Sequence, residues 1–413
     1  MASKRVRDLA DACRAELEYF PVLLGGLYEG TKAPQGKDGS ATDVMAPVKQ
    51  KYLAEDFQRE RERWGVTLKW NPKHPVRSVQ AQRLLAGIRE QKKRAKVTDE
   101  LFSLYWQQEG DVSDESALRA IARKNEVSVE EIDRALADKE ALKRNTDWAV
   151  QRGVFGVPTF FVTVNGQVDD RFWFGGDRMF LVAHRLGVPK DHRLGRPLRL
   201  FPSNVQSSYR PKLEWFHDFS SPWSYLSATQ VERIAQEHNA ILVPRPILLG
   251  ALFKGIGTPN VPMFAMSEAK RAYGAVDMED WKTWWGGISL TFPQGFPIRT
   301  VNPLRVSIAE PKVIPVLYKA AWVDGLNIGE DAILADVLSK NRFDAASLLK
   351  RAKDDPTLKE ELIRNTNEAM KRGICGVPTF SVDDGPIVWG QDRFNIVEDD
   401  IEAAKQRKSG AKL

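Results

Sequence analysis

The stretch FHDFSSPWSYLSATQ (216–230) places two serines and a proline directly after an apolar, aromatic run. The run predicts a short strand, and Pro222 after Ser221 is typical of a helix that begins there. A serine at this point caps the helix by accepting a backbone hydrogen bond. A strand, a tight turn and a helix N-terminus are also where enzymes keep a nucleophile or an anion site. The residues alone leave both roles open for Ser221.

Other chemistry is restricted by composition. The 413 residues contain only two cysteines, Cys13 and Cys375, far apart in the sequence, which excludes a disulfide framework and a Cys-x-x-Cys redox pair. The five histidines form no cluster with zinc spacing, so no metal site is expected. A chain that is 42% hydrophobic and 28% charged is typical of a globular protein of two or three domains. The net charge of +6 is spread along the chain, and neither a nucleic-acid motif nor an apolar run of membrane-spanning length is present.

The elements that must position the serine turn occur in a tandem repeat. LKRNTDWAVQRGVFGVPTF (142–160) matches LIRNTNEAMKRGICGVPTF (362–380), and FGGDRM (174–179) matches WGQDRF (389–394). FPVLLGGLYEGTKAP (20–34) and HPVRSVQAQR (74–83) match RPILLGALFKGIGTP (245–259) and FPIRTVNPLR (296–305) in the same order. We therefore expect a first repeat at 1–200, a Pro/Ser/Asn-rich linker at 201–212, a second repeat at 213–406 and a tail at 407–413.

Hydrophobic patterns predict the plan of the second repeat. Strands are expected at 212–219 and 240–249, with a helix at 223–239 between them. A long region rich in helical periodicity, 258–355, follows. The repeat ends with a helix at 356–373, two strands at 376–382 and 386–392, and a helix at 393–407. The plan is thus β-α-β, a helical insertion and α-β-β-α, and the first repeat is expected to share it.

This order, with Val-Pro-Thr at the start of the third strand, resembles the thioredoxin fold with the inserted helical domain of the DsbA branch. The serine in place of a cysteine resembles the kappa-class glutathione transferases and the 2-hydroxychromene-2-carboxylate isomerases. The segments that carry this resemblance are FHDFSSPWSYL, PILLGALFK, EAKRAY, FPIRTVNPLR, GVPTF and GQDRF. They cover nearly the whole second repeat.

The resemblance implies a glutathione site in the second repeat. Ser221 would stand at the nucleophile position and hold the glutathione sulfur as a thiolate, with help from the helix N-terminus. Comparable sites lower a thiol pKa from about 8.5 to roughly 3.5–7.5. Pro378 would be cis, so that the backbone of Val377 pairs with the peptide. The other implied glutathione-binding residues are Asn260, Lys270, which would pair with a glutathione carboxylate, and Gln391 and Asp392, which would hold the γ-glutamyl end.

Simpler roles stay open for several of these residues. Asp392 suits a helix N-cap, and Lys270 suits a solvated helix face. The loop around Asn260 departs from the family's spacing, so Thr258 is an alternative there. Gln391 stands where the family commonly has a small polar residue.

A second-substrate side is implied near Thr300 and Asn302. Trp285 falls on one helical face with Trp281 and Trp284, which indicates either core packing or an aromatic wall for a flat, apolar co-substrate. Cys375 aligns with Phe155 of the first repeat, which indicates apolar filling.

The first repeat lacks one part of the plan. Aligning VRDLADACRAELEYFPVLLG (6–25) with VERIAQEHNAILVPRPILLG (231–250) places Met1 inside the first helix, so the first strand and the serine turn are absent. The empty strand position could be filled by RPLRLF (196–201), by another chain, or by residues upstream in a longer protein, which the clean alignment favours. Without a nucleophile, the first repeat is expected to be structural.

The resemblance implies a glutathione-dependent transferase or isomerase that acts on an apolar electrophile, and the sequence does not separate the two. The alternative is a non-catalytic glutathione- or partner-binding pseudo-dimer scaffold. A DsbA-type oxidoreductase is excluded by the missing cysteines. Either a homodimer or an internal pseudo-dimer is compatible with two fused repeats. The final AKL is close to the S-K-L peroxisomal address, which predicts a peroxisomal import receptor as a partner, with mitochondrion and cytosol as alternatives.

Overall fold

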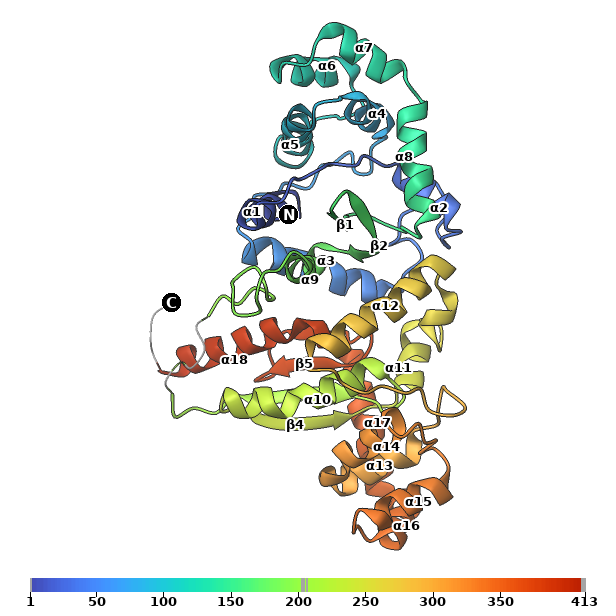
Figure 1. The fold of residues 1–413 in the computed structure, drawn as a ribbon. Coiled ribbons are helices and arrows are strands. Elements are labelled where there is room, and N and C mark those ends of the chain that lie inside the picture. Colours follow the sequence, from blue (N-terminus) through green and yellow to red (C-terminus); the bar gives the residue numbers. More distant parts are fainter. Residues whose placement is uncertain (1, 202–204, 206, 410–413) are drawn as a thin grey trace. The chain divides into compact units, whose positions relative to one another are not determined.

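The protein is described by a computed structural model, which covers residues 2–201, 205 and 207–409 (Figure 1). The chain divides into two compact units. Unit 1 comprises 1–44, 55–197 and 265–275, and unit 2 comprises 45–54, 198–264 and 276–413. The division differs from the two repeats in two segments, because 45–54 of the first repeat belongs to unit 2 and 265–275 of the second repeat belongs to unit 1.

Unit 2 is built on a four-stranded sheet in the order β4-β3-β5-β6. The strands are β3 (Lys212–His217), β4 (Ile241–Pro246), β5 (Thr379–Val382) and β6 (Ile387–Trp389). β3 runs parallel to β4 and antiparallel to β5, which pairs antiparallel with β6. α10 (Pro222–Glu237) packs on β4, and α18 (Phe394–Ser409) packs on β5 (Figure 1). The thioredoxin-like order predicted from the sequence is confirmed.

The central position of β3 follows from its composition. Leu213, Trp215 and Phe216 are buried, and the polar residues Glu214 and His217 of the same strand are buried as well. A strand covered on both faces requires such a run of apolar side chains. Glu214 is tolerated there because Arg245 and Arg372 pair with its carboxylate.

The predicted helical insertion of the second repeat is also confirmed. Its helices are α11 (Leu249–Ile256), α12 (Glu268–Trp284), α13 (Val301–Ala309), α14 (Ile314–Trp322), α15 (Asp331–Lys340) and α16 (Ala345–Asp354). α17 (Pro356–Lys371) leads back to the sheet. Pro356 follows the capping residue Asp355, whose side chain accepts a hydrogen bond from Thr357 N. This start is the one that Asp-Pro favours.

Unit 1 is mostly helical. Its helices are α1 (Ala2–Cys13), α2 (Leu24–Gly30), α4 (Val79–Gly87), α5 (Gln91–Gln107), α6 (Glu115–Lys124), α7 (Val129–Ala137), α8 (Glu140–Gln151) and α9 (Met179–Arg185). α3 (Pro47–Arg63) and α12 are each divided between the units. An antiparallel pair, β1 (Thr159–Val164) and β2 (Gln167–Phe174), is the sheet of this unit among the described residues. α4 to α7 enclose a core that contains Leu84, Val97, Leu118 and Ile132.

The first repeat departs from the expected common plan at one segment. Residues 15–23, which align with β4, form no strand. In unit 2 the partner of β4 is β3, and among the described residues no strand pairs with 15–23. A segment without a ladder partner cannot satisfy its backbone groups as a strand.

RPLRLF (196–201), one of the three possibilities for the empty strand position, forms no strand. The segment instead binds α18. Asp399 accepts hydrogen bonds from Arg199 Nε and from the backbone N–H groups of Leu200 and Phe201. A buried carboxylate thus takes the backbone donors that a strand would need for its ladder.

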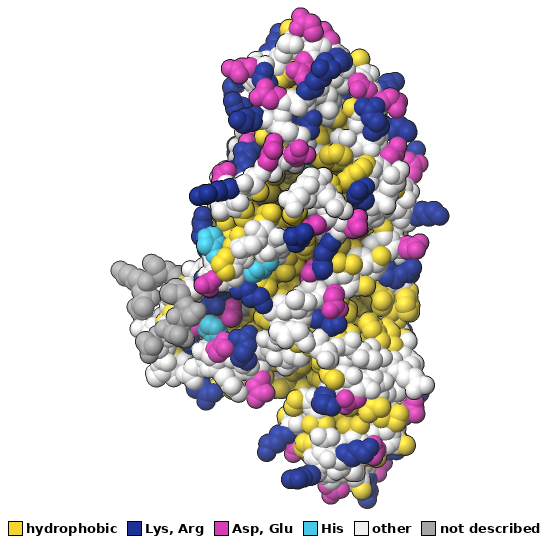
Figure 2. Space-filling view, in the orientation of Figure 1, with side chains coloured by type: hydrophobic (Ala, Val, Ile, Leu, Met, Phe, Trp, Pro, Cys, Tyr) yellow, Lys and Arg dark blue, Asp and Glu magenta, His cyan; other side chains and the backbone are white. Residues whose placement is uncertain are grey.

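Other predictions concern the surface and the tail. Lys and Arg are interspersed with Asp and Glu on the face that Figure 2 shows, in line with the dispersed charge of the sequence. Among the described residues, the helices are too short or too polar to cross a membrane. The AKL tail (411–413) lies outside the described residues, as does part of the predicted linker.

Candidate active site

Ser221 stands where the sequence predicts a helix start, and both of its possible roles have a structural basis. It is the N-cap of α10, and its Oγ accepts a hydrogen bond from Ser224 N at 3.2 Å. The same hydroxyl donates to the carbonyl oxygen of Val377 at 3.3 Å. Its side chain is buried. The cap is therefore real, and it also holds the hydroxyl against the loop before β5.

That loop contains the expected cis proline. The Val377–Pro378 peptide bond is cis, and so is Val157–Pro158 at the equivalent point of the first repeat. Two further cis bonds, His74–Pro75 and Phe296–Pro297, lie in the matching HPVRS and FPIRT segments and were not predicted. The structure thus brings Ser221, Val377 and Pro378 together as the resemblance implies.

Asp218 anchors the serine turn and was missed by the sequence analysis. Its carboxylate accepts hydrogen bonds from Ser220 N at 2.9 Å and from Leu249 N at 2.8 Å, while its own carbonyl oxygen accepts from Ser221 N. Burial raises the pKa of Asp218, and these hydrogen bonds oppose that effect. The sequence signal that could have identified Asp218 is its position at the end of an apolar strand, two residues before Ser220.

Aromatic rings line the interior beside the turn. His217 stacks on Trp215 with ring centroids 4.2 Å apart, and its Nδ1 lies 3.0 Å from the hydroxyl of Tyr318. Burial lowers the pKa of His217 to about 3. The imidazole is therefore neutral at physiological pH and acts as a hydrogen-bond partner, not as an acid.

The predicted γ-glutamyl side is attached to the same loop. Gly390 N donates to the carbonyl oxygen of Pro378 at 3.0 Å. Gln391 is buried, and its Oε1 accepts a hydrogen bond from Trp285 Nε1 at 2.9 Å. Asp392 lies in the 3-10 turn Gln391–Arg393, before the start of α18. Gln391 and Asp392 thus lie next to a residue that is bonded to the cis-proline loop, and Trp285 contacts Gln391 there.

The other predicted residues lie at different distances from this loop. Thr300 is buried, and its side chain is one of the groups that oppose the rise of the Asp218 pKa. Asn260 is exposed, with its side-chain oxygen beside Gly250 at the start of α11. Asn302 donates to Asp331 at 2.8 Å, within the helical insertion. Thr300 and Asn260 therefore adjoin the turn through Asp218 and α11, whereas Asn302 is engaged elsewhere.

Lys270 is not placed in the unit that holds Ser221. It is exposed and lies in 265–275, which belongs to unit 1. Cys375 is buried in unit 2, and burial raises the pKa of its thiol to about 12. That value agrees with the predicted filling role. Trp281 is buried in the core, as the simpler interpretation had it.

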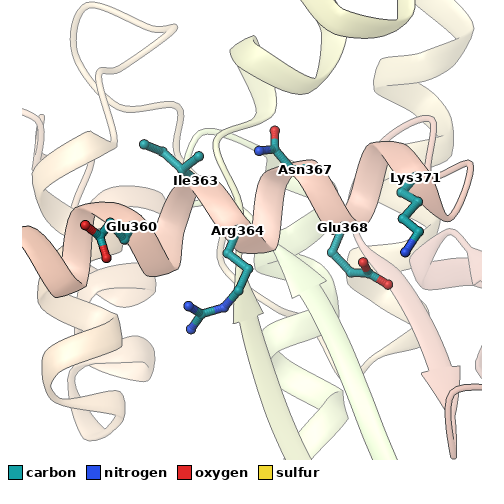
Figure 3. Close-up of a pocket in the computed structure, with 6 residues that line it drawn as sticks. All are labelled: Glu360, Ile363, Arg364, Asn367, Glu368 and Lys371. Carbon is teal, nitrogen blue, oxygen red and sulfur yellow. The ribbon is translucent and has the colours of Figure 1, made fainter.

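A hollow on α17 contains none of the predicted site residues. Figure 3 shows the six side chains that line it, all from this helix: Glu360, Ile363, Arg364, Asn367, Glu368 and Lys371. Arg364 pairs with Glu361 on the same face. The hollow is a charged helix surface and adds nothing to the candidate site.

Comparison with known proteins decides the family. A model of the DsbA-like thioredoxin domain matches residues 1–187 and again 212–402. The chain belongs to the DsbA-like thioredoxin domain family. This DsbA-like protein contains two such domains in tandem, in agreement with the repeats.

Its relatives include proteins with named activities. It is 27% identical to a 2-hydroxychromene-2-carboxylate isomerase of Pseudomonas putida over 190 residues, which are 45% of this chain and 92% of the relative. It is 27% identical to the human glutathione S-transferase kappa 1 over 185 residues, 41% of this chain and 77% of the relative. Among solved structures, a 2-hydroxychromene-2-carboxylate isomerase aligns with 49% of this DsbA-like chain and 100% of its own, at 22% identity and a TM-score of 0.44.

Proposed function

We propose that the second repeat is a glutathione-dependent transferase or isomerase in which Ser221 stabilises the glutathione thiolate. The observation that carries this proposal is the position of the Ser221 hydroxyl. It lies at the N-terminus of α10 and 3.3 Å from the carbonyl oxygen that precedes cis-Pro378. The named relatives, which include an isomerase and a kappa glutathione transferase, support the general class.

The chemistry follows from the donors at this point. The Ser221 O–H, now directed at Val377 O, can turn to donate to a sulfur that binds beside it. The helix N-terminus adds partial positive charge, and each pKa unit by which the thiol is lowered corresponds to about 1.4 kcal/mol. The buried surroundings strengthen both effects because they exclude water.

The thiolate then acts on an apolar electrophile. In a transfer, a bond forms between sulfur and the electrophilic carbon, the leaving group departs with the displaced electron pair, and the conjugate is released. In an isomerisation, the sulfur adds to an unsaturated carbon, a bond rotates in the adduct, and the same carbon–sulfur bond breaks, so the thiol is regenerated. Ser221 has the same role in both reactions.

The residues around the turn fit the rest of a γ-glutamyl tripeptide. Asp392 offers a carboxylate for the ligand amine, and the backbone of Val377 offers strand-like hydrogen bonds. Gln391 is oriented by the Trp285 indole. Thr300 and Asn260 adjoin the turn from the helical insertion and from the end of α11. Asn302 stays a prediction without such support, and Lys270, which belongs to unit 1, is not part of the site proposed for unit 2.

The test separates capping from catalysis. Ser221→Ala removes both the cap and the donor, whereas Ser221→Gly removes the donor and weakens the cap only slightly. We expect both variants to lose activity towards 1-chloro-2,4-dinitrobenzene and 2-hydroxychromene-2-carboxylate in the presence of glutathione, with Ser221→Gly unfolding at nearly the wild-type temperature.

An active Ser221→Gly variant would show that Ser221 only caps the helix. Glutathione binding by the wild type without turnover of either compound would favour the scaffold alternative.

The cellular location and the assembly are separate proposals. The C-terminal AKL supports recognition by a peroxisomal import receptor. A fluorescent fusion that ends in the native tail should reach peroxisomes, and the same fusion without the last three residues should not. The choice between a homodimer and an internal pseudo-dimer is decided by the mass of the purified protein in solution.

A further inference from the structure

Unit 2 contains a helical segment that comes from the first repeat. This segment, 45–54, includes the start of α3. The Tyr52 hydroxyl accepts a hydrogen bond from Trp389 N at 2.8 Å, and the two rings meet edge to face with centroids 5.7 Å apart. The first repeat therefore contacts the end of β6, directly before Gly390 and Gln391.

The second repeat makes the same contact in unit 1. The Tyr273 hydroxyl accepts a hydrogen bond from Phe174 N at 2.9 Å, at the end of β2. Tyr52 and Tyr273 match in PVKQKY (47–52) and EAKRAY (268–273), and Trp389 matches Phe174. Each repeat thus supplies a tyrosine to the strand end of the other repeat. The same tyrosine contact therefore occurs in both directions, at equivalent positions of the two repeats.

Lys49 lies three residues before Tyr52, on the same face of α3. Its Nζ is 5.2 Å from the centroid of the Trp389 ring, a distance at which a cation interacts with the ring face. The side chain is partly buried, and no carboxylate lies within ion-pair distance of it in the part of the chain that the structure describes. Burial lowers the pKa of Lys49. A desolvated ammonium without a carboxylate is costly, and an anionic ligand would offset that cost.

Trp389 connects Lys49 to the candidate site. Its indole lies against Gly376, two residues before Pro378. The next residue, Gly390, bonds to the carbonyl oxygen of Pro378, and the Ser221 hydroxyl bonds to Val377 O. The Trp389 side chain therefore contacts both Lys49 and the loop that Ser221 contacts.

We propose that Lys49 of the first repeat binds a carboxylate of the ligand in the site of the second repeat. This inference rests on the function proposed above and names a further residue for that site. The carboxylate belongs either to the glycyl end of glutathione or to the co-substrate. Lys270, which the motif indicated for such a role, is the equivalent lysine of the second repeat and belongs to unit 1. The first repeat, expected to be structural, then completes the site.

The test compares Lys49→Met with Lys270→Met as its matched control, in the full-length protein. Glutathione binding is measured by calorimetry, so that the result does not depend on turnover. If the carboxylate belongs to glutathione, loss of the charge-assisted hydrogen bond in Lys49→Met should weaken glutathione binding by about tenfold or more. Lys270→Met should bind like the wild type, and Lys49→Arg should recover most of the affinity.

Two further measurements identify which carboxylate Lys49 binds. If Lys49 pairs with the glycyl carboxylate, glutathione esterified at glycine should bind the wild type and Lys49→Met equally well. If it pairs with the co-substrate, glutathione binding is unchanged, and Lys49→Met shows a raised KM for the carboxylate-bearing chromene substrate but not for the uncharged 1-chloro-2,4-dinitrobenzene.

Three outcomes overturn the inference: a Lys49→Met variant with unchanged binding and unchanged KM values, a loss of affinity in Lys270→Met instead, or a wild type that does not bind glutathione. A wild type that binds glutathione but turns over no electrophile would overturn the proposed function alone, because the calorimetric comparison still decides the role of Lys49. Should Lys49→Met unfold, Lys49→Gln replaces it in the same comparison.

Discussion

The Ser221 hydroxyl donates a hydrogen bond to the carbonyl oxygen of Val377, 156 residues later in the chain. This contact joins the start of α10 to the cis-proline loop, the two features that the proposed thiolate site requires. Asp218 fixes the turn on one side, and Gly390 fixes the loop on the other. The site therefore depends on backbone positions that single substitutions can disturb.

Asp218→Asn should impair the serine turn without removing the serine. The carboxylate accepts from two backbone N–H groups, and an amide can replace only one of these acceptors. Leaving a buried donor unsatisfied costs about 1–3 kcal/mol. We expect a lower unfolding temperature and a lower kcat, with a raised thiol pKa of bound glutathione.

Asp344→Asn is the control for that variant. Asp344 caps α16, far along the chain from the serine turn, and accepts a hydrogen bond from Ser347 N. Its replacement should leave the kinetics and the thiol pKa unchanged. If Asp218→Asn behaves like this control, Asp218 does not position Ser221.

Gly390→Ala should damage the γ-glutamyl side. The backbone at Gly390 has φ 114°, and a Cβ there would collide with the Asp392 carboxylate. Such a backbone conformation costs a residue with a side chain about 1–3 kcal/mol, and Asp392 would also have to move. We expect glutathione to bind more weakly, as measured by calorimetry.

Gly175→Ala provides a control within the same chain. Gly175 has φ 95°, and a Cβ there would meet the carboxylate of Asp177 in the same way. Gly175 belongs to unit 1 and the Ser221 turn to unit 2, so this variant should lose similar stability and retain wild-type affinity. Equal losses of affinity in both variants would argue against a role of Asp392.

The sequence predicted the sheet because apolar runs and turn residues, which mark β3 to β6, are local signals. The cis form of Pro378 was implied by the family resemblance. A strand was expected at 15–23, where the structure has none, because strand formation also depends on a pairing partner. The contact between Tyr52 and Trp389 joins residues 337 positions apart, and only the folded chain reveals it. The anchoring of the serine turn by Asp218 likewise depends on the burial of this residue, which its residue type does not predict.

Glu214 should make stability depend on pH. Burial alone would raise its pKa, but Arg372 and Arg245 outweigh burial and lower the pKa to about 2 from an ordinary 4.5. The stabilisation is therefore fully present above pH 4.5 and is lost as the pH falls towards 2. Glu214→Gln leaves two partly buried arginines without this carboxylate and should cost at most about 3 kcal/mol at pH 7.

Urea unfolding at pH 7 and at pH 3 tests this prediction. The difference between wild type and Glu214→Gln should shrink at the lower pH. A difference that stays constant between the two pH values would mean that the carboxylate is not held ionised by its arginine partners.

Cys375 should be unreactive in the folded protein. Its pKa of about 12 keeps the thiol protonated at pH 8, and it is buried, whereas Cys13 is partly exposed. In a Cys13→Ser variant, Ellman's reagent should release almost no chromophore until the protein is denatured. Rapid labelling of native Cys13→Ser would contradict the filling role of Cys375.

The central claim is that one hydroxyl at the start of α10 keeps the sulfur of a bound tripeptide ionised. Ultraviolet difference absorbance of the thiolate, recorded against pH with saturating glutathione, measures this directly. The wild type should titrate well below the ordinary thiol value of about 8.5, and Ser221→Ala should titrate at least about one unit higher. Identical titration curves for the two proteins would contradict the claim.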